Sequence, residues 1–366
     1  MNERRMAATG LILIAVALAG MPLNAEDKEN SMQLLEVRKI WDAAQHNAFT
    51  DLVRFKDRWY CAFREGLDHG GNEGKLRVLT SADGSEWTSV ALMNWEGGEV
   101  RDAKLSLTAD GQLMLNGAVR FLKPADEKKA YQSVTWLSAD GKNWTGPYAC
   151  PSGLGTWRWS VTWHKDYAYS FGYGCGGKDA DGCLYRSRDG KSWEVVKTNV
   201  FPKAQAAAMG NETSLLFLPD GTACCLLRFD EAGGNYTQAN APGSAAQFGT
   251  ARPPYTDWTW KSLGVRIGGP KMIRLDDGRF LAAVRLYDGG WWHPAHTALA
   301  WIDPQAGTFS EALKLPSSGD NSYAGLVWHE GLLWMSYYSS HEGKTSIYLA
   351  KVRIPGKPTN APKPRP

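Results

Sequence analysis

One pattern recurs six times in this sequence of 366 residues: an apolar run, a short polar turn and a second apolar run, typical of two antiparallel β-strands. The six copies begin roughly 52–58 residues apart, near Asn47, Arg101, Trp159, Asn211, Gly269 and Tyr323. Four strands fit in that length, and six four-stranded sheets in a ring make a β-propeller. The sequence therefore predicts an all-β, six-bladed propeller. Two stacked β-sandwiches are the alternative, which six similar units disfavour.

A propeller has to join its first and last blades. The sixth unit is short, because its strand pattern runs out near 346–354, whereas residues 32–41 (MQLLEVRKIW) form a spare apolar strand before the first unit. We therefore expect the N-terminal strand to complete the last blade and to close the ring. The propeller domain is predicted to span residues 26–355.

A second repeat, Ser-x-Asp-Gly-x-x-Trp, occurs at 81–88, 138–145 and 187–194. Serine and aspartate side chains bond to nearby backbone amides, and glycine adopts a conformation that other residues avoid. The tryptophan then packs on the hairpin beneath it. The motif falls between the third and fourth strands of a unit, towards the outside of the ring. We therefore interpret it as scaffold and look for function elsewhere.

The two ends of the chain differ in composition from the rest. Residues 1–25 combine a charged start, an apolar run at 7–20 and a helix-breaking tail, which is typical of a signal peptide. A membrane anchor is the alternative, but the apolar run is short for a bilayer. The proline-rich residues 356–366 are predicted to be disordered. We expect an exported protein, periplasmic or extracellular, with no stable membrane insertion.

Charge and cysteine content exclude some classes of function. The formal net charge is only +3 and no long basic run occurs, which argues against nucleic-acid binding. The six cysteines lack metal-binding spacing, and neither a metal nor a cofactor is expected. Cys175 and Cys183 could close a loop, whereas the neighbours Cys224 and Cys225 are expected on opposite faces of one strand. The sequence does not indicate an oligomeric state.

The start of the innermost strand and the end of the second strand lie on one rim of an antiparallel blade, and polar residues gather at these places. The second strands end at Arg64 and Glu65, Arg120, Tyr173, Arg228, Arg285, and His341 and Glu342. The first strands begin with His46 and Asn47, Arg101 and Asp102, Trp159, Glu212 and Tyr323. Solvated strand ends are the alternative interpretation. Clustered arginines suit an anionic ligand, and carboxylates beside them suit acid–base work on a glycoside.

Several of these segments resemble the sialidase (neuraminidase) superfamily, whose six-bladed propellers carry Asp-boxes like the three Ser-x-Asp-Gly-x-x-Trp stretches. NETSLLFLPDGTACCLLR is similar to the segment that supplies a glutamate and an arginine, here Glu212 and Arg228. NSYAGLVWHEGLLWMSYY is similar to the segment with the tyrosine nucleophile, here Tyr323. Arg285 falls where the blade-five arginine is expected. The resemblance implies a retaining exo-glycosidase that releases a terminal acidic sugar, with sialic acid the leading case. It also implies that Glu212 is the base for Tyr323.

Two departures from the sialidase pattern stand in blade one. HNAFTDL lacks the arginine of the family's Arg-Ile-Pro segment, and Arg64 or Arg101 is expected to replace it. The loop LDHGGNEGK offers Asp68, His69 and Glu73 where the family has its acid/base aspartate; we expect Glu73, ahead of Asp68, to be the general acid.

Other rim residues and other functions complete the expectations. Asp102 and Glu342 are predicted to contact the acidic glycan substrate, together with the arginines. A hydrolase or lyase for another acidic polysaccharide and a non-catalytic glycan-binding propeller are the alternative functions.

Overall fold

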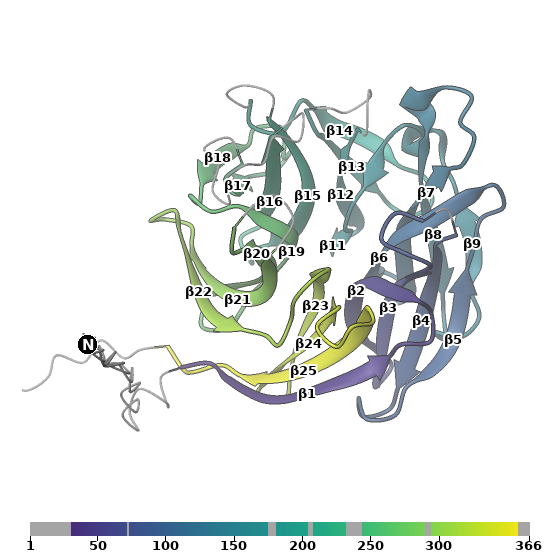
Figure 1. Ribbon diagram of the computed structural model, residues 1–366. Helices are drawn as coiled ribbons and strands as arrows, with labels where there is room; N and C mark the ends of the chain where they lie inside the picture. The colour runs from purple at the N-terminus through teal and green to yellow at the C-terminus, as the bar shows by residue number, and fades with distance from the viewer. Residues whose placement is uncertain are drawn as a thin grey trace, which may run out of the picture.

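A computed structural model of the chain describes residues 31–71, 73–174, 181–203, 208–231, 244–289 and 294–357. They form six antiparallel sheets in a ring, as predicted, and in five of them the strands follow one another outwards in chain order (Figure 1). The innermost strands are β2 (His46–Phe55), β6 (Gly98–Leu107), β10 (Trp157–Arg158) with β11 (Thr162–His164), β15 (Ala208–Phe217), β19 (Ile267–Arg274) and β23 (Asn321–His329).

Three further strands complete each blade outside the innermost one. The second strands are β3 (Arg58–Gly66), β7 (Leu113–Phe121), β12 (Tyr167–Tyr173), β16 (Ala223–Glu231), β20 (Phe280–Tyr287) and β24 (Leu332–Ser339). The third strands are β4 (Lys75–Ser81), β8 (Tyr131–Ser138), β13 (Cys183–Ser187), β17 (Gln247–Ala251), β21 (Ala295–Asp303) and β25 (Ser346–Arg353). The outermost strands are β5 (Thr88–Met93), β9 (Thr145–Tyr148), β14 (Glu194–Thr198), β18 (Thr259–Ser262), β22 (Thr308–Lys314) and β1 (Gln33–Trp41).

The ring closes as the sequence predicts. The last blade has the strand order β1-β25-β24-β23, so its outermost strand comes from the N-terminus (Figure 1). The register of β1 on β25 runs from Gln33 opposite Arg353 to Trp41 opposite Ile347. The predicted signal peptide and residues 358–366 of the predicted tail lie outside the described residues. No helix in the described part of the chain has the length and apolar character to cross a bilayer.

The described cysteines confirm one expectation. Cys224 and Cys225 are both buried in β16, and they pack in different hydrophobic clusters, on opposite faces of the blade. Cys175 lies outside the described residues, so its pairing with Cys183 stays a prediction.

The three Ser-x-Asp-Gly-x-x-Trp turns join third to fourth strands, where the sequence places them. In each, the glycine N–H donates to the serine Oγ at 2.8 Å, and the glycine has a φ between 71° and 82°. The aspartate accepts hydrogen bonds from the backbone: Asp140 Oδ1 accepts from Lys142 N at 2.8 Å and from Asn143 N at 2.7 Å. All of these bonds lie within the turn itself, as expected for a motif that stabilises the scaffold.

Replacing Asp140 by Ala is expected to weaken the fold and to spare activity. The change removes the acceptor for two turn amides, so we expect the melting temperature to fall by about 2–4 °C. Thermal unfolding measures the first effect, and turnover per folded molecule measures the second. Loss of turnover without a change in melting temperature would mean that the turn serves the site directly.

Five of the innermost strands contain a β-bulge near their start. The register shifts lie between Ala48 and Asp51, Arg101 and Lys104, Gly210 and Thr213, Gly268 and Lys271, and Ser322 and Gly325. A bulge bends its strand and re-aims side chains, and it often lies beside an active site. In these bulges the φ angles of Phe49, Asp102 and Tyr323 are 63°, 55° and 48°, a region that is strained for side-chain-bearing residues. The bulges therefore mark where the fold tolerates strain to present side chains at the centre of the ring.

Candidate active site

Tyr323 and Glu212 meet at the centre of the ring, although 111 residues separate them in the chain. Tyr323 Oη donates to Glu212 Oε1 at 2.5 Å, across from β23 to β15. Arg228, from β16, donates from Nη1 to the same carboxylate oxygen at 2.7 Å and to Tyr323 Oη at 3.1 Å. Tyr323 and Glu212 are each only 6% exposed. The structure thus brings together the three residues that the sequence resemblance singles out.

The bulge of blade five fixes this pair. Gly269 donates its N–H to Glu212 Oε2 at 2.7 Å, so both carboxylate oxygens are held. A Cβ at Gly269 would stand 2.7 Å from Tyr323 Cδ2, and the φ of Gly269 is 56°, so glycine is required here. The rings of Phe49 and Trp159 lie 5.2 and 5.8 Å from the Tyr323 ring and complete its surroundings.

The protonation states of the pair follow from burial and charge. Burial raises the pKa of Tyr323 well above its ordinary value, and the charge of Glu212 raises it further. Burial also acts to raise the pKa of Glu212. The charge of Arg228 and the hydrogen bonds from Tyr323, Arg228 and Gly269 outweigh that effect, so the pKa lies below its ordinary value. At neutral pH the phenol therefore keeps its proton and donates it to an ionised carboxylate.

Two guanidinium groups near the centre of the ring are partly exposed. The Arg228 side chain is 13% exposed, its Nε lies 2.7 Å from Asp230 Oδ2, and its Nη2 makes no hydrogen bond to a described residue. The Arg101 side chain is 14% exposed and lies 5.2 Å above the Phe49 ring. Guanidinium groups bind carboxylates through paired hydrogen bonds, so these two suit an anionic ligand.

Asp102 is a buried carboxyl group in the bulge of blade two, next to Arg101 in the chain. Burial raises its pKa to about 6, the charge of Glu212 adds to that shift, and Arg101 and Lys104 act against it. A carboxyl that titrates near neutral pH can donate a hydrogen bond to a sugar hydroxyl or accept one. The predicted contact of Asp102 with the substrate stays a prediction.

The raised pKa of Asp102 implies a cost to stability above pH 6. The ionised form is disfavoured in the folded protein, so the cost is absent below the unfolded value of 3.8 and is complete above about 6. That difference corresponds to about 3 kcal/mol. Asp102→Asn should therefore raise the free energy of unfolding at pH 8 by up to about 3 kcal/mol and change it little at pH 4. Denaturant titrations at both pH values test this, and an equal effect at the two would contradict it.

Two predicted binding residues are held by other partners in the chain, which corrects their expected positions. Arg64 is 0% exposed, because its Nε donates to Glu99 Oε1 at 2.7 Å and its two Nη atoms donate to backbone carbonyls of Asp68 and Gly71. Arg64 holds the loop at 67–75 through these bonds and does not replace the missing arginine. Glu342 forms an ion pair of 2.8 Å with Lys39 of the outermost strand β1.

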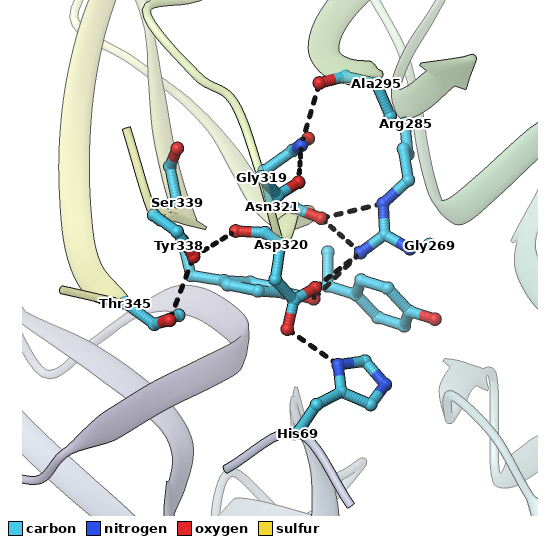
Figure 2. A network of polar contacts seen from close by, with 12 residues as sticks. His69, Gly269, Arg285, Ala295, Gly319, Asp320, Asn321, Tyr338, Ser339 and Thr345 are labelled. Carbon is cyan, nitrogen blue, oxygen red and sulfur yellow. Dashed lines mark hydrogen bonds and ion pairs between the residues drawn. The ribbon is translucent and has the colours of Figure 1, made fainter. Parts of the chain in front are cut away.

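Arg285 is also buried, and its guanidinium pairs with a carboxylate of the chain itself (Figure 2). Its Nη2 donates to Asp320 Oδ1 at 3.1 Å, to Tyr338 Oη at 2.9 Å and to the backbone oxygen of Asn321. Arg285 is 1% exposed. The guanidinium that was expected to bind the substrate anion thus binds Asp320, a residue that the sequence analysis did not single out. Its position directly before Asn321, the first residue of β23, gave only a weak signal.

The loop at 67–75 presents a different residue from the two expected. Asp68 and Glu73 are both exposed, and Asp68 Oδ1 accepts a hydrogen bond from the nearby Gly70 N–H. His69, between them in the same loop, turns to the ring centre and its Nδ1 lies 2.6 Å from Asp320 Oδ2. The structure therefore brings His69 into contact with Asp320 and leaves Glu73 and Asp68 exposed.

One group of three described residues has the side chains for a metal: His46, His69 and Asp320. The two imidazoles lie 2.9 and 2.6 Å from the same Asp320 oxygen. Ligands about 2.1 Å from a tetrahedral zinc ion stand roughly 3.4 Å apart. The observed separations are those of hydrogen bonds, and we assign the group as a hydrogen-bonded cluster.

The chain matches no protein-family model and no curated protein. It is similar to a Dyadobacter fermentans protein of unknown function, with a TM-score of 0.70 and 18% identity over 88% of this chain and 99% of that one. A Trypanosoma rangeli sialidase bound to 2,3-difluorosialic acid as a covalent intermediate gives a TM-score of 0.61 at 12% identity, over 86% of this chain and 54% of that one.

The NanB sialidase of Streptococcus pneumoniae gives a TM-score of 0.62 at 11% identity, over 88% of this chain and 70% of that one. The chain thus spans about half the length of the trypanosomal enzyme. These structural matches establish the architecture. At identities this low they do not establish the activity, which has to be argued from the site. The chain has the six-bladed β-propeller fold of the sialidases.

Proposed function

We propose that this protein is a retaining exo-glycosidase that releases a terminal acidic sugar, with sialic acid the leading candidate, and that it acts outside the cytoplasm. The observation that carries the proposal is the bond of 2.5 Å between Tyr323 and Glu212, with Arg228 on both. A buried tyrosine with its own carboxylate acceptor has the arrangement of a nucleophile and its base. The covalent intermediate of the T. rangeli sialidase supports such a reaction in this fold.

In the proposed first step, Tyr323 Oη forms a bond to the anomeric carbon while the bond to the leaving group breaks. The phenol proton passes to Glu212, which is ionised and in contact. Because the pKa of Tyr323 is raised, its proton leaves only as the new bond forms. In the second step water attacks the anomeric carbon, the tyrosine leaves and the proton returns. A phenol brings no full negative charge towards an anionic sugar, unlike a carboxylate nucleophile.

Arg228 is the residue placed to bind the acidic group of the substrate, because it is partly exposed and holds the nucleophile. Arg228→Lys keeps the charge but removes the planar fork, so we expect kcat/KM to fall roughly 10–100-fold. Steady-state kinetics on the cleaved glycoside measure this. Arg186→Lys, at an exposed ion pair with Glu194 in blade three, is the matched control. Equal activity of wild type and Arg228→Lys would exclude a clamp at this residue.

A second candidate is a hydrolase for another acidic sugar. Blade one has Phe49 in its bulge and supplies no arginine of its own there, and Arg285 is paired with Asp320. Of the arginines expected to bind the substrate anion, Arg228 and Arg101 therefore remain, and these two suit an acidic group other than that of sialic acid.

The test is a screen of the purified protein on sialylated and uronate-capped glycosides, with the released sugar followed by NMR. Initial release of the sugar with the anomeric configuration of the substrate supports the proposal. Treatment with 2,3-difluorosialic acid, or with the fluorinated form of whichever sugar is released, should add its mass to the peptide that contains Tyr323. Labelling of a carboxylate peptide, or absence of hydrolysis across the panel, would overturn the proposed function.

A further inference from the structure

We propose that His69, oriented by Asp320, is the general acid/base of this glycosidase, an inference that rests on the proposed function. The reaction requires a group that protonates the leaving oxygen and later takes a proton from water. The loop of blade one is where such a group was expected, on Glu73 or Asp68. In the structure those two carboxylates are exposed, and the histidine between them is the side chain that reaches the central cluster.

Asp320 is held rigidly enough to orient an imidazole. Arg285 and Tyr338 donate to its Oδ1 at 3.1 and 2.8 Å, and His46 Nε2 and His69 Nδ1 lie 2.9 and 2.6 Å from its Oδ2. The Asp320 side chain is only 13% exposed. A carboxylate on one imidazole nitrogen fixes the tautomer and aims the other nitrogen. In Figure 2 the second nitrogen of His69 points away from Asp320.

The ring of His69 lies near Tyr323 and is partly exposed. It meets the Phe49 ring edge-on at 5.1 Å, and the Phe49 ring is 5.2 Å from the Tyr323 ring. Arg101 Nη2 donates to the backbone oxygen of His69 at 2.6 Å and fixes the loop. The His69 side chain is 36% exposed, against 6% exposure for Tyr323. A leaving group departs towards solvent, so an acid that is more exposed than the nucleophile suits this role.

Charged groups around His69 make it a ready proton donor. Those that face it are Asp320, Arg101, Arg285 and, through Asp320, His46. Burial lowers the pKa of His69, the charges of Arg101 and Arg285 lower it further, and Asp320 opposes them. The imidazolium therefore gives up its proton easily, and the neutral ring is available as a base. Because the acid form of His69 is required, kcat/KM for an unactivated glycoside should fall as the pH rises through the pKa of His69, which lies below its ordinary value of 6.5.

The proton balance closes with these residues alone. In the first step the His69 imidazolium gives its Nε2 proton to the glycosidic oxygen as the carbon–oxygen bond breaks. In the same step Tyr323 bonds to the anomeric carbon and Glu212 takes the phenol proton. In the second step neutral His69 takes a proton from water, whose oxygen bonds to the anomeric carbon. The tyrosine–carbon bond breaks as that new bond forms, and Glu212 returns its proton to the phenol.

The test compares His69→Gln with Asp68→Asn, Glu73→Gln and Asp102→Asn on two substrates. These are the 4-methylumbelliferyl and the lactose-linked glycosides of sialic acid, or the same pair for the sugar found in the screen. An aryl leaving group needs little protonation. His69→Gln should therefore lower kcat/KM about 100- to 10,000-fold on the lactose-linked substrate and less than about tenfold on the aryl one. Azide should restore aryl turnover by replacing the water of the second step.

The variants at Asp68 and Glu73 are expected to act as wild type on both substrates, since those side chains lie outside the cluster. Asp320→Asn should retain the shape of the cluster, shift the alkaline limb of the pH profile to lower pH and leave aryl hydrolysis least affected. His46→Gln, which keeps Asp320, is the second variant if Asp320→Asn does not fold; it removes a second donor to Asp320, which raises basicity there, and should shift that limb to higher pH.

Three outcomes would overturn this inference while the proposed function stands. One is an equal loss of both activities in His69→Gln, and another is the substrate-selective loss in Glu73→Gln, Asp68→Asn or Asp102→Asn instead. The third is activity abolished by EDTA and restored by zinc, which would make the cluster a metal site. A wild-type protein that cleaves neither substrate of any pair would overturn the proposed function, and the role of His69 with it.

Discussion

Tyr323→Phe is expected to lower kcat by at least about 1,000-fold while substrate binding persists, because the nucleophilic oxygen is lost and the ring is kept. The ring packs against Phe49 and Trp159 and under the guanidinium of Arg285, and none of these contacts uses the hydroxyl. Binding should be measured by calorimetry with the released sugar, and turnover with the substrate that the wild type cleaves.

Tyr337→Phe is the matched control for this change. Tyr337 is a buried tyrosine of β24 whose hydroxyl donates to Pro316 O at 3.0 Å, and its ring packs against Tyr348, outside the site. Both variants lose one oxygen from a buried ring, so a nonspecific effect on folding would appear in both. Near-wild-type turnover in Tyr323→Phe, or a similar loss in the two variants, would rule out Tyr323 as the nucleophile.

The architecture could be predicted because it depends on local signals that repeat. Strand pairs, turn residues and the spacing of about 55 residues are each written in contiguous sequence, and six copies reinforce one another. The closure by β1 followed from counting strands, and the placement of the Asp140 turn followed from its position between the third and fourth strands. Glu212, Arg228 and Tyr323 were found because they lie in contiguous segments that resemble sialidases.

The fate of the other arginines could not be predicted, because it depends on partners from other blades. Arg64, Arg228 and Arg285 end equivalent strands and look alike in sequence. Glu99 of blade two buries Arg64, and Asp320 of blade six buries Arg285, whereas Arg228 keeps an exposed face. Whether a guanidinium at a strand end meets solvent or a carboxylate depends on contacts across the ring, and strand periodicity carries no information on these.

The direction of the central side chains could not be predicted from strand periodicity either. A regular strand alternates its side chains between two faces, but the bulges break this alternation at Phe49, Asp102 and Tyr323. The residues with left-handed backbone in these three bulges are not glycines, so the sequence does not mark them. His69 was visible in the loop, but its contact with Asp320 spans 251 residues and required the closed ring.

Glu212→Gln is the second change with a large expected effect. The amide has one acceptor oxygen in place of two, so it cannot serve Tyr323, Arg228 and the Gly269 N–H as the carboxylate does. It also cannot take up the phenol proton. We expect kcat to fall about 100- to 10,000-fold, the range for loss of a positioned base. Glu65→Gln is the matched control, a largely buried glutamate that binds Trp41 and Arg77 in blade one.

A titration of Tyr323 separates a base from a residue that merely holds the tyrosine. The charge of Glu212 raises the pKa of Tyr323, so Glu212→Gln should lower that pKa and make the tyrosinate easier to form. If ionisation of the tyrosine alone limited the reaction, the variant would become faster at high pH. A variant that stays slow while its tyrosine titrates at lower pH, by ultraviolet difference spectra against Tyr323→Phe, identifies proton acceptance as the role of Glu212.

Combining the two substitutions tests whether the pair acts as one unit. Residues that serve a single chemical step lose their effect once the partner is gone, so Tyr323→Phe with Glu212→Gln should be little slower than Tyr323→Phe alone. Fully additive losses would mean that Glu212 acts through Arg228 or Gly269 and independently of the phenol. The bond of 2.5 Å from Tyr323 Oη to Glu212 Oε1 favours the non-additive result, because the proton that one residue releases is the proton that the other receives.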